Sequence, residues 1–218
     1  MKYYPVYLNV QHQSCLVVGA GAVGTRKIHT LLSFDANITA VSLKATDSIH
    51  QLALEKRIIL KLRSYRTSDL ENMLLVFGTT DNESLNRKIY SDAKNLGKLC
   101  NIADQPDLCT FILPSVVQRG DLILAISTSG KSPAYAKRIK QQLEKQFGPE
   151  YGEFLKLMGS IRKKMLMKHH DPDAHRSLFE QLIDHGLLDL VRNGDKYLID
   201  QLLTSVLGQD FHYDLLTD

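Results

Sequence analysis

Three glycines with the spacing G-x-G-x-x-G lie near the start of the chain, in the segment CLVVGAGAVGTRK. The apolar run before them predicts a strand, and the periodic residues after them predict a helix. In such a turn Gly19 permits the tight bend, Gly21 lets the backbone approach a pyrophosphate, and Gly24 lets the helix pack against the strand. The helix N-terminus offers free N–H groups to the phosphates. The motif predicts a dinucleotide site; a strand-to-helix turn that binds nothing is the alternative.

The acidic residue that usually binds the ribose is missing from its expected place. It commonly lies about 20 positions after the glycines, at the end of the second strand. Here that place reads VSLKAT, and the first carboxylate after it belongs to Asp47. Either backbone groups near Leu43 and Lys44 hold the ribose, or Lys44 favours the 2′-phosphate of NADP. The pattern alone leaves the choice between NAD and NADP open.

Two further polar segments follow predicted strands, where ligands bind in open α/β sheets. The segment GTTD places Thr79, Thr80 and Asp81 at the edge of the predicted cofactor cleft, while Asp81 is also a candidate cap of the next helix. Asp104 follows the strand-like segment KLCNIA. It is either a turn-forming aspartate or a catalytic one.

Hydroxyl groups, a glycine and a lysine gather in the loop STSGKSP, directly before the basic helix AYAKRIKQQLEKQF. We expect Ser132 to cap this helix and Pro133 to be its first residue. Backbone N–H donors and a cation in one loop suit an anionic group, and an ordinary capped loop is the alternative. The nearby basic residues indicate a solvated helix face or an acidic substrate. They are Arg119, Lys131, Lys137, Arg138 and Lys140.

The elements that must position these residues alternate between strand and helix up to about residue 112. Strands are expected at 6–10, 15–18, 37–43, 58–62, 73–80 and 98–103, and helices at 23–32, 48–56 and 82–95. This alternation predicts a parallel sheet with helices on both faces. The fold class is therefore α/β, with a Rossmann-like parallel sheet domain over residues 1–112.

The rest of the chain breaks this alternation. In TFILPSVVQRGDLILAIST two strand-like runs are joined at 118–121 as in a hairpin, so residues 113–147 predict a mixed strand and helix region for dimerisation or substrate contact. Residues 148–218 predict a C-terminal helical domain, because apolar residues recur at three- and four-residue spacing. Five of them are expected to pack in its core: Leu182, Ile183, Leu187, Leu188 and Val191.

Composition excludes several classes of function. The chain has 218 residues, 44% hydrophobic and 23% charged, which is typical of a globular protein, and its net charge of +3 is too small to indicate nucleic acid. Three cysteines in or beside apolar runs predict buried thiols in a reducing compartment. Without a signal-peptide core or a long apolar run, we expect a cytoplasmic protein that does not enter a membrane. His169 and His170 are adjacent and would not face each other on a helix, so no metal site is expected.

The chain resembles the precorrin-2 dehydrogenases of sirohaem synthesis, which also form the N-terminal part of sirohaem synthases. The resemblance rests on motifs in the same order over residues 3–150: YPVYLN, CLVVGAGAVGTRK, GTTDNESLN, NIADQPDLCTFILPS and ISTSGKSPAYAKRI. Many members have Ala where this chain has Thr25. Many also lack the acidic residue after the second strand, so VSLKAT supports the resemblance. The helical tail fits the family only loosely.

The resemblance implies a homodimeric dehydrogenase that oxidises precorrin-2 to sirohydrochlorin with NAD. Some members also insert Fe²⁺ to give sirohaem, and no ligand cluster here decides whether this chain does. The family's essential aspartate falls on Asp104, the candidate base. The cofactor contacts fall on Gly19, Gly21, Ala22, Val23, Gly24, Leu43, Lys44, Thr80 and Asp81. The groups suited to the carboxylates of the substrate are Ser127, Ser129, Gly130, Lys131 and Arg138.

Two other classes of protein fit part of this pattern. A non-catalytic nucleotide-sensing domain would also have the glycine motif, but such domains usually keep the acidic residue after the second strand. Another small-molecule oxidoreductase that uses NADP is the second alternative, for which Lys44 would be the indication.

Overall fold

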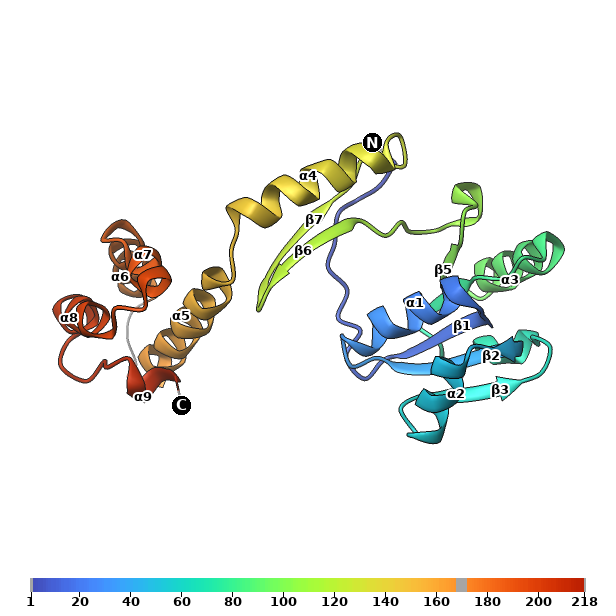
Figure 1. Ribbon diagram of the computed structural model, residues 1–218, viewed down its shortest axis with the longest axis horizontal. Coiled ribbons are helices and arrows are strands. Elements are labelled where there is room, and N and C mark those ends of the chain that lie inside the picture. Colours follow the sequence, from blue (N-terminus) through green and yellow to red (C-terminus); the bar gives the residue numbers. More distant parts are fainter. Residues whose placement is uncertain (1, 168–171, 218) are drawn as a thin grey trace. The chain divides into compact units, whose positions relative to one another are not determined.

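The structure is a computed structural model that describes residues 2–167 and 172–217, so His169 and His170 lie outside the described residues. The chain divides into two compact units, Met1–Leu113 and Pro114–Asp218 (Figure 1). Within the described ranges, no helix combines the length and the apolar character that crossing a membrane requires.

A five-stranded parallel sheet forms the centre of the first unit, in the order β3-β2-β1-β4-β5. The strands are β1 (Ser14–Ala20), β2 (Asn37–Ala45), β3 (Ile59–Leu62), β4 (Leu75–Gly78) and β5 (Leu99–Ile102). The helices between them are α1 (Ala22–Leu32), α2 (Asp47–Leu54) and α3 (Glu83–Asn95), with the short 3-10 helices η1 (Thr67–Leu70) and η2 (Pro106–Leu108). The predicted Rossmann-like α/β fold is confirmed.

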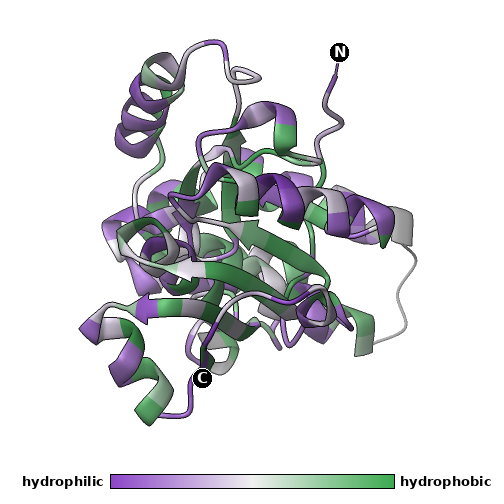
Figure 2. Ribbon diagram, turned by 90° about the vertical axis from the view of Figure 1, so that its right-hand side faces the viewer, coloured by the Kyte–Doolittle hydropathy of each residue, from purple (hydrophilic) through white to green (hydrophobic). Residues whose placement is uncertain are grey.

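Alternating side chains of the buried strands form two cores, one on each face of the sheet. Cys15 and Val17 of β1 pack with α1 and α2, whereas Leu16 and Val18 pack with α3 and η1. Figure 2 shows the strands in the hydrophobic colour and the helices with mixed faces. Because both faces of the sheet are covered, its central strands are apolar throughout. The carboxyl ends of β1, β2, β4 and β5 consequently lead into the polar segments that the sequence singled out.

The strand predicted at 6–10 is wrong. This segment has no strand structure, and Val6 and Leu8 are 60% and 45% exposed. Its alternating pattern resembles a strand, but the described sheet pairs it with no neighbour, and a strand needs a paired backbone. The ends of the other predicted strands and helices of this unit differ by at most two residues from those observed.

The second unit combines the predicted hairpin with helices. Strands β6 (Ser115–Arg119) and β7 (Leu122–Ile126) are antiparallel, and Gly120 takes a left-handed φ of 56° in the turn between them. The helices are α4 (Pro133–Gln146), α5 (Glu150–Met167), α6 (Pro172–Asp184), α7 (Leu187–Asn193), α8 (Lys196–Leu207) and α9 (Asp214–Thr217). The hairpin prediction is confirmed. The further division of this unit at 147/148 stays a prediction.

A third apolar core lies among α5 to α9. Leu182 and Leu187 are fully buried in it, and Val191 packs against it. Leu188, also predicted to lie in this core, is only partly buried and does not belong to it. Ile183, which the periodicity assigned to the core, is 54% exposed. It follows Leu182 directly, and one residue turns the side chain by about 100° on a helix, away from the buried face.

Candidate functional site

The glycine turn, residues 19–24, joins β1 to α1, and two of its glycines are fixed by close packing. Gly19 has a left-handed φ of 100°. A Cβ on Gly24 would lie 2.0 Å from the carbonyl oxygen of Gly19, so only glycine lets α1 start this close to β1. A Cβ on Gly21 would meet no atom within 4 Å. The space beside Gly21 therefore accommodates a ligand group, as the motif predicts.

Thr79 holds the turn from the neighbouring strand. Its hydroxyl donates to the carbonyl oxygens of Val18 (3.0 Å) and Gly19 (2.8 Å), and its N–H donates to Val18 (2.8 Å). The sequence places Thr79 at the edge of the cofactor cleft, but its hydroxyl is already used inside the protein. The only indication in the sequence was its position after an apolar strand. That position does not distinguish a residue that stabilises the turn from one that contacts a ligand.

The start of α1 presents backbone donors to the space beside Gly21. Gly21 is the N-cap and provides no side-chain cap, and the first turn has no acidic residue. The first N–H groups, including those of Ala22 and Val23, have no partner within the helix. Such a helix end attracts anions through its free donors and its dipole. The residues present thus fit the pyrophosphate of a dinucleotide.

The end of β2 is bound to the glycine turn by hydroxyl groups that no sequence pattern indicated. Ser42 accepts a hydrogen bond from the N–H of Ala20 (3.2 Å) and donates to the carbonyl of Lys44 (2.6 Å). The hydroxyls of Thr25 and Thr46 lie 2.9 Å apart. These contacts fix the backbone where the ribose-binding acid is absent. The side chains of Leu43 and Lys44 are exposed there.

Thr80 and Asp81 follow β4 at the same edge of the sheet. Thr80 donates to the amide oxygen of buried Asn86 (2.8 Å), whose nitrogen donates back to the Thr80 carbonyl (2.9 Å). Asn82, not Asp81, caps α3: its side chain accepts the N–H of Leu85 at 3.0 Å. The capping role proposed for Asp81 is wrong because the helix begins one residue later than that role requires. Asp81 is left exposed beside Thr80.

Asp104 lies after β5, in a turn with a left-handed φ of 58°. Its side chain is exposed, and its carboxylate accepts no hydrogen bond from the described residues. The segment after it folds back beside β5, where Thr110 bonds to both backbone groups of Cys100 (2.8 Å each way). Asp104 is thus positioned by β5 before it and by the segment at Thr110 after it. It presents a free carboxylate at the edge of the sheet where the glycine turn also lies. A non-glycine residue in this conformation is a feature of many functional sites.

The three cysteines are free thiols, and they are neither activated as nucleophiles nor grouped as metal ligands. Burial raises the pKa of Cys15 to about 11 and that of Cys100 to about 12, and it also raises the pKa of Cys109. These thiols are therefore protonated at neutral pH. Within residues 2–167 and 172–217, no group of three His, Cys, Asp or Glu side chains is placed to hold a metal ion.

In the second unit, the backbone donors of the loop STSGKSP are less available to an anion than its sequence predicts. Ser129 and Gly130 take left-handed φ values of 53° and 80°. The N–H groups of Ser129, Lys131 and Ser132 already bond within the loop. The loop therefore offers an anion mainly its exposed side chains and the Lys131 ammonium. The predicted cap is confirmed, since Ser132 accepts the N–H of Tyr135 at 3.2 Å and α4 begins at Pro133.

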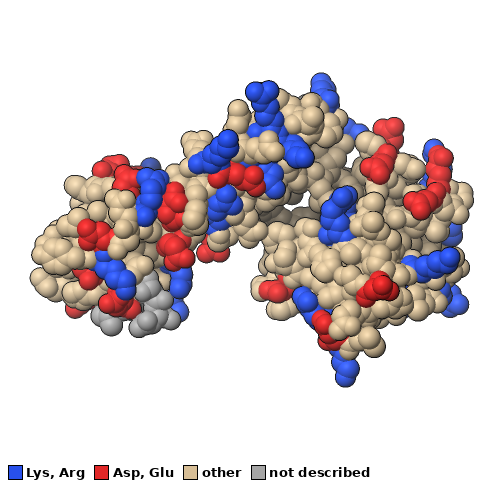
Figure 3. All heavy atoms as spheres, in the orientation of Figure 1, with Lys and Arg blue, Asp and Glu red and all other residues tan. Residues whose placement is uncertain are grey.

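The basic residues around this loop divide into an anchored group and an exposed group. The guanidinium of Arg119 donates to the carbonyls of Phe147 (2.9 Å) and Glu144 (3.1 Å), so it fastens β6 to the end of α4. Lys131, Lys137 and Arg138 are exposed, whereas Lys140 is half-buried and its ammonium lies 3.6 Å from the carboxylate of Glu144. Figure 3 shows Lys and Arg gathered over α4. The exposed set remains available to an acidic ligand, whereas Arg119 serves the fold.

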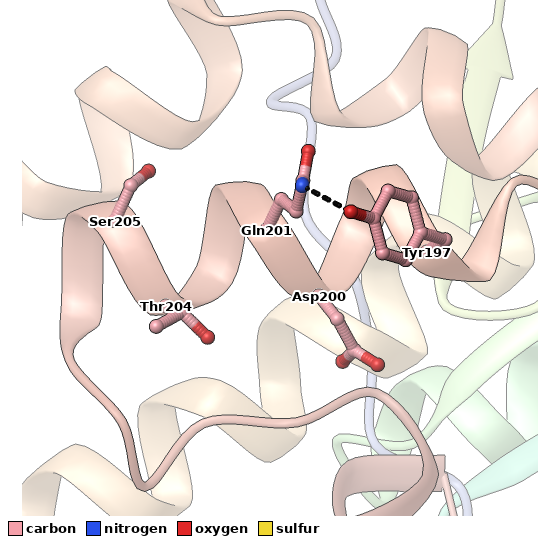
Figure 4. A pocket seen from close by; sticks show the side chains of 5 residues that line it. All are labelled: Tyr197, Asp200, Gln201, Thr204 and Ser205. Atoms are coloured by element: carbon pink, nitrogen blue, oxygen red, sulfur yellow. Dashed lines mark hydrogen bonds between the residues drawn. The ribbon is translucent and has the colours of Figure 1, made fainter.

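An open pocket of about 440 Å³ lies on α8 in the second unit, and no predicted site residue lines it. Figure 4 shows its lining, in which the amide of Gln201 donates to the Tyr197 hydroxyl at 2.7 Å. The other lining residues are Asp200, Thr204 and Ser205. This hollow contains neither the glycine turn nor Asp104, so we assign the candidate site to the carboxyl edge of the sheet instead.

Comparison with known proteins agrees with this assignment. The family model described as "Putative NAD(P)-binding" matches residues 6–115, about half of the chain, and the model "Sirohaem biosynthesis protein central" matches residues 119–146. The siroheme synthase of Ruthia magnifica is 33% identical over 195 residues, which cover 89% of this chain and 41% of that protein. The siroheme synthase of Pseudoalteromonas atlantica is 32% identical over 212 residues, 97% of this chain and 46% of that protein.

The chain thus spans less than half the length of these curated relatives. A solved structure described as SirC, precorrin-2 dehydrogenase, matches along nearly its whole length. Its TM-score is 0.78 at 26% identity, over 94% of this chain and 98% of that one. The glycine turn therefore lies within an NAD(P)-binding domain, and the chain belongs to the family of NAD(P)-binding sirohaem biosynthesis proteins.

Proposed function

We propose that this chain is a precorrin-2 dehydrogenase that forms sirohydrochlorin and uses NAD. The observation that carries the proposal is the pairing, at one edge of one sheet, of the glycine turn with the free carboxylate of Asp104. The siroheme synthases and the precorrin-2 dehydrogenase structure to which the chain is similar support this choice of reaction. Since the curated relatives are more than twice as long, the proposal covers this one reaction only.

In this proposal the chain's own residues hold the cofactor by backbone groups. The N–H groups at the start of α1 and the open space at Gly21 receive the pyrophosphate, and the fixed backbone at Leu43 and Lys44 receives the ribose. Thr80 and Asp81 lie at the same edge of the sheet and contact the cofactor there. When bound, NAD supplies the hydride acceptor of the reaction.

We favour NAD over NADP because no arginine lies at the end of β2. A 2′-phosphate is commonly accommodated by an arginine. Residues 37–46 contain Lys44 but no arginine. Fluorescence titration with each cofactor tests this, and we expect NAD to bind at least tenfold more tightly; equal affinities would contradict it.

Asp104 is the proposed base. Oxidation of precorrin-2 to sirohydrochlorin transfers one hydride to NAD and releases one proton. An exposed carboxylate without an internal partner is free to accept that proton from the substrate. We further propose that exposed side chains of the second unit bind substrate carboxylates. They are Ser127, Ser129, Lys131 and Arg138, together with the exposed backbone at Gly130.

Replacement of Asp104 tests the reaction and the role together. We expect wild-type protein to form NADH and the sirohydrochlorin spectrum from precorrin-2, and Asp104→Ala to lose at least a hundredfold in kcat with an unchanged Kd for NAD. Wild-type turnover by Asp104→Ala would exclude it as the base. Wild-type protein that binds NAD but leaves precorrin-2 unchanged would instead be a nucleotide-sensing domain.

We also propose that the chain works as a homodimer. A two-stranded sheet is marginal in water by itself, and the side chains of Leu122, Ile123 and Leu124 on β7 are only partly buried. A second copy would cover this apolar surface. Sedimentation at micromolar concentration is expected to give twice the chain mass, and a monomer there would contradict the proposal.

A further inference from the structure

Lys27 is a charged residue of the first unit to which the proposed function gives no role. It lies on α1, soon after the glycine turn, and its side chain is half-buried although lysines are mostly exposed. Among the described residues its ammonium group donates no hydrogen bond and forms no direct ion pair. A charge taken partly out of water without a partner costs free energy. A ligand of opposite charge would offset that cost.

The geometry of α1 directs Lys27 toward β4 and β5. Thr25 contacts Thr46 at the end of β2, which marks the flank of α1 on that side. Gly24 and Ile28 are buried against the sheet. At about 100° per residue, Lys27 lies on the other side of this buried face from Thr25. Because β1 lies between β2 and β4, that other flank faces the half of the sheet that ends in β5.

Asp104 follows β5 and acts on Lys27 from that side. Burial, the largest effect, and the charge of Arg26 lower the pKa of Lys27, while the charges of Asp104 and Cys109 raise it. The net result is a pKa below the usual range of a lysine. The carboxylate of Asp104 therefore compensates the ammonium only in part, and both groups keep free hydrogen-bonding capacity on this side of α1.

We infer that Lys27 binds an acidic side chain of the substrate and thereby positions the substrate against Asp104. The inference rests on the proposed function, from which it takes a tetrapyrrole that bears eight carboxylates. Such a substrate would be repelled by an anionic base alone. A lysine beside that base offsets the repulsion, and its attraction for a carboxylate is stronger because it is partly removed from water.

A phosphate of the cofactor is the competing ligand, and the position of Lys27 argues against it. The free N–H groups belong to the first turn of α1, whereas Lys27 lies five residues after Ala22, about 7.5 Å further along the axis. Arg26 provides a matched control, since it is exposed and carries the same charge on the same helix. The two side chains differ in their direction and in their exposure.

The experiment compares Lys27→Met, Lys27→Arg and Arg26→Met in the full chain. We expect Lys27→Met to raise the KM for precorrin-2 and the Kd for uroporphyrin, an octacarboxylate porphyrin, at least tenfold. The Kd for NAD should stay within twofold of wild type. Lys27→Arg should recover most of the affinity, and Arg26→Met should behave as wild type. Since Lys27 has no direct partner, Lys27→Met should not lower the Tm.

The outcomes separate this inference from the proposed function. Weaker NAD binding by Lys27→Met would assign Lys27 to a phosphate, and equal losses in Lys27→Met and Arg26→Met would show a general effect of charge; each overturns the inference. If Lys27→Met fails to fold, the affinities of Lys27→Gln for precorrin-2, uroporphyrin and NAD provide the test instead. Lys27-dependent binding of uroporphyrin without oxidation of precorrin-2 would support the carboxylate site and contradict the dehydrogenase.

Discussion

At the scale of single residues, the three glycines of the turn serve different requirements. Gly19 and Gly24 are required by the fold, because a side chain on either would collide with backbone atoms of Thr79 or Gly19. Gly21 is not, because its φ of −78° suits any residue and its surroundings are open. A glycine that the fold does not need is best explained by the ligand. The two requirements can therefore be separated by mutation.

We predict that Gly24→Ala and Gly21→Ala fail in different ways. Gly24→Ala should lower the free energy of unfolding by about 1–3 kcal/mol, because the start of α1 must move off β1. Gly21→Ala should stay within about 0.5 kcal/mol of wild type but lose at least tenfold in NAD affinity. Urea unfolding and NAD titration measure the two effects. A stable Gly24→Ala, or a Gly21→Ala with full NAD affinity, would contradict this division.

At the scale of elements, η1 is fastened between β3 and β4 by one buried carboxylate. Asp69 is 3% exposed and receives two hydrogen bonds from Arg63, at 2.6 and 2.8 Å, and one from the N–H of Arg66. Lys61 lies 3.5 Å away. The hydrogen bonds from Arg63 are the main reason that the pKa of Asp69 falls from 3.8 to about 2. Folding therefore favours the charged form of Asp69.

This carboxylate is expected to make stability depend on acid. Because its pKa is lower in the folded chain than in the unfolded one, its contribution is complete above about pH 4 and is lost as the pH falls through 2. The contribution is about 2 kcal/mol. At pH 7 the free energy of unfolding of Asp69→Asn, measured in urea, should be lower than that of wild type. The difference should shrink toward pH 2. The exposed Asp107→Asn is the control, and a difference independent of pH would contradict the assignment.

A second contact between elements, made by Arg119, joins the hairpin of β6 and β7 to α4. Arg119 bonds to two carbonyls at the end of α4, so Arg119→Ala leaves these acceptors with water only and removes the packing of the side chain. We expect a loss of about 1–3 kcal/mol in the second unit, measured by hydrogen exchange of β6 and α4. Lys137→Ala removes an exposed charge from the same helix and should change little. Equal effects of the two substitutions would show that charge, not anchoring, matters.

The elements themselves were largely predictable from the sequence, but the contacts among them were not. Apolar runs and glycine spacing predicted β1 and α1, since these are local properties. The segment 6–10 has the same alternation and yet is no strand, because pairing depends on distant residues. Asn and Asp are both common helix caps, and Asn82 is the cap here because α3 begins at Glu83. The hydroxyl contacts of Ser42 and Thr79 join different strands, and no local pattern signals them.

At the scale of the whole molecule, the division into two compact units separates cofactor binding from the helical core. The glycine turn, the end of β2 and Asp104 all belong to Met1–Leu113. The apolar core of α5 to α9 belongs entirely to Pro114–Asp218. A ligand stabilises the part of the chain that must be folded to bind it. NAD should therefore act on one unit more than on the other.

We predict that hydrogen exchange of the full chain will show this asymmetry. With NAD at 100 times its Kd, the folded first unit gains about 2.7 kcal/mol, so exchange of β1, β2 and β4 through global opening should slow about a hundredfold. Amides of α5 and α8, whose Leu157 and Leu203 lie in the helical core, should change less than twofold. Gly21→Ala at the same NAD concentration should reduce the slowing to about tenfold or less. Equal slowing of both units would mean that they unfold together, and the cofactor would then stabilise the entire chain.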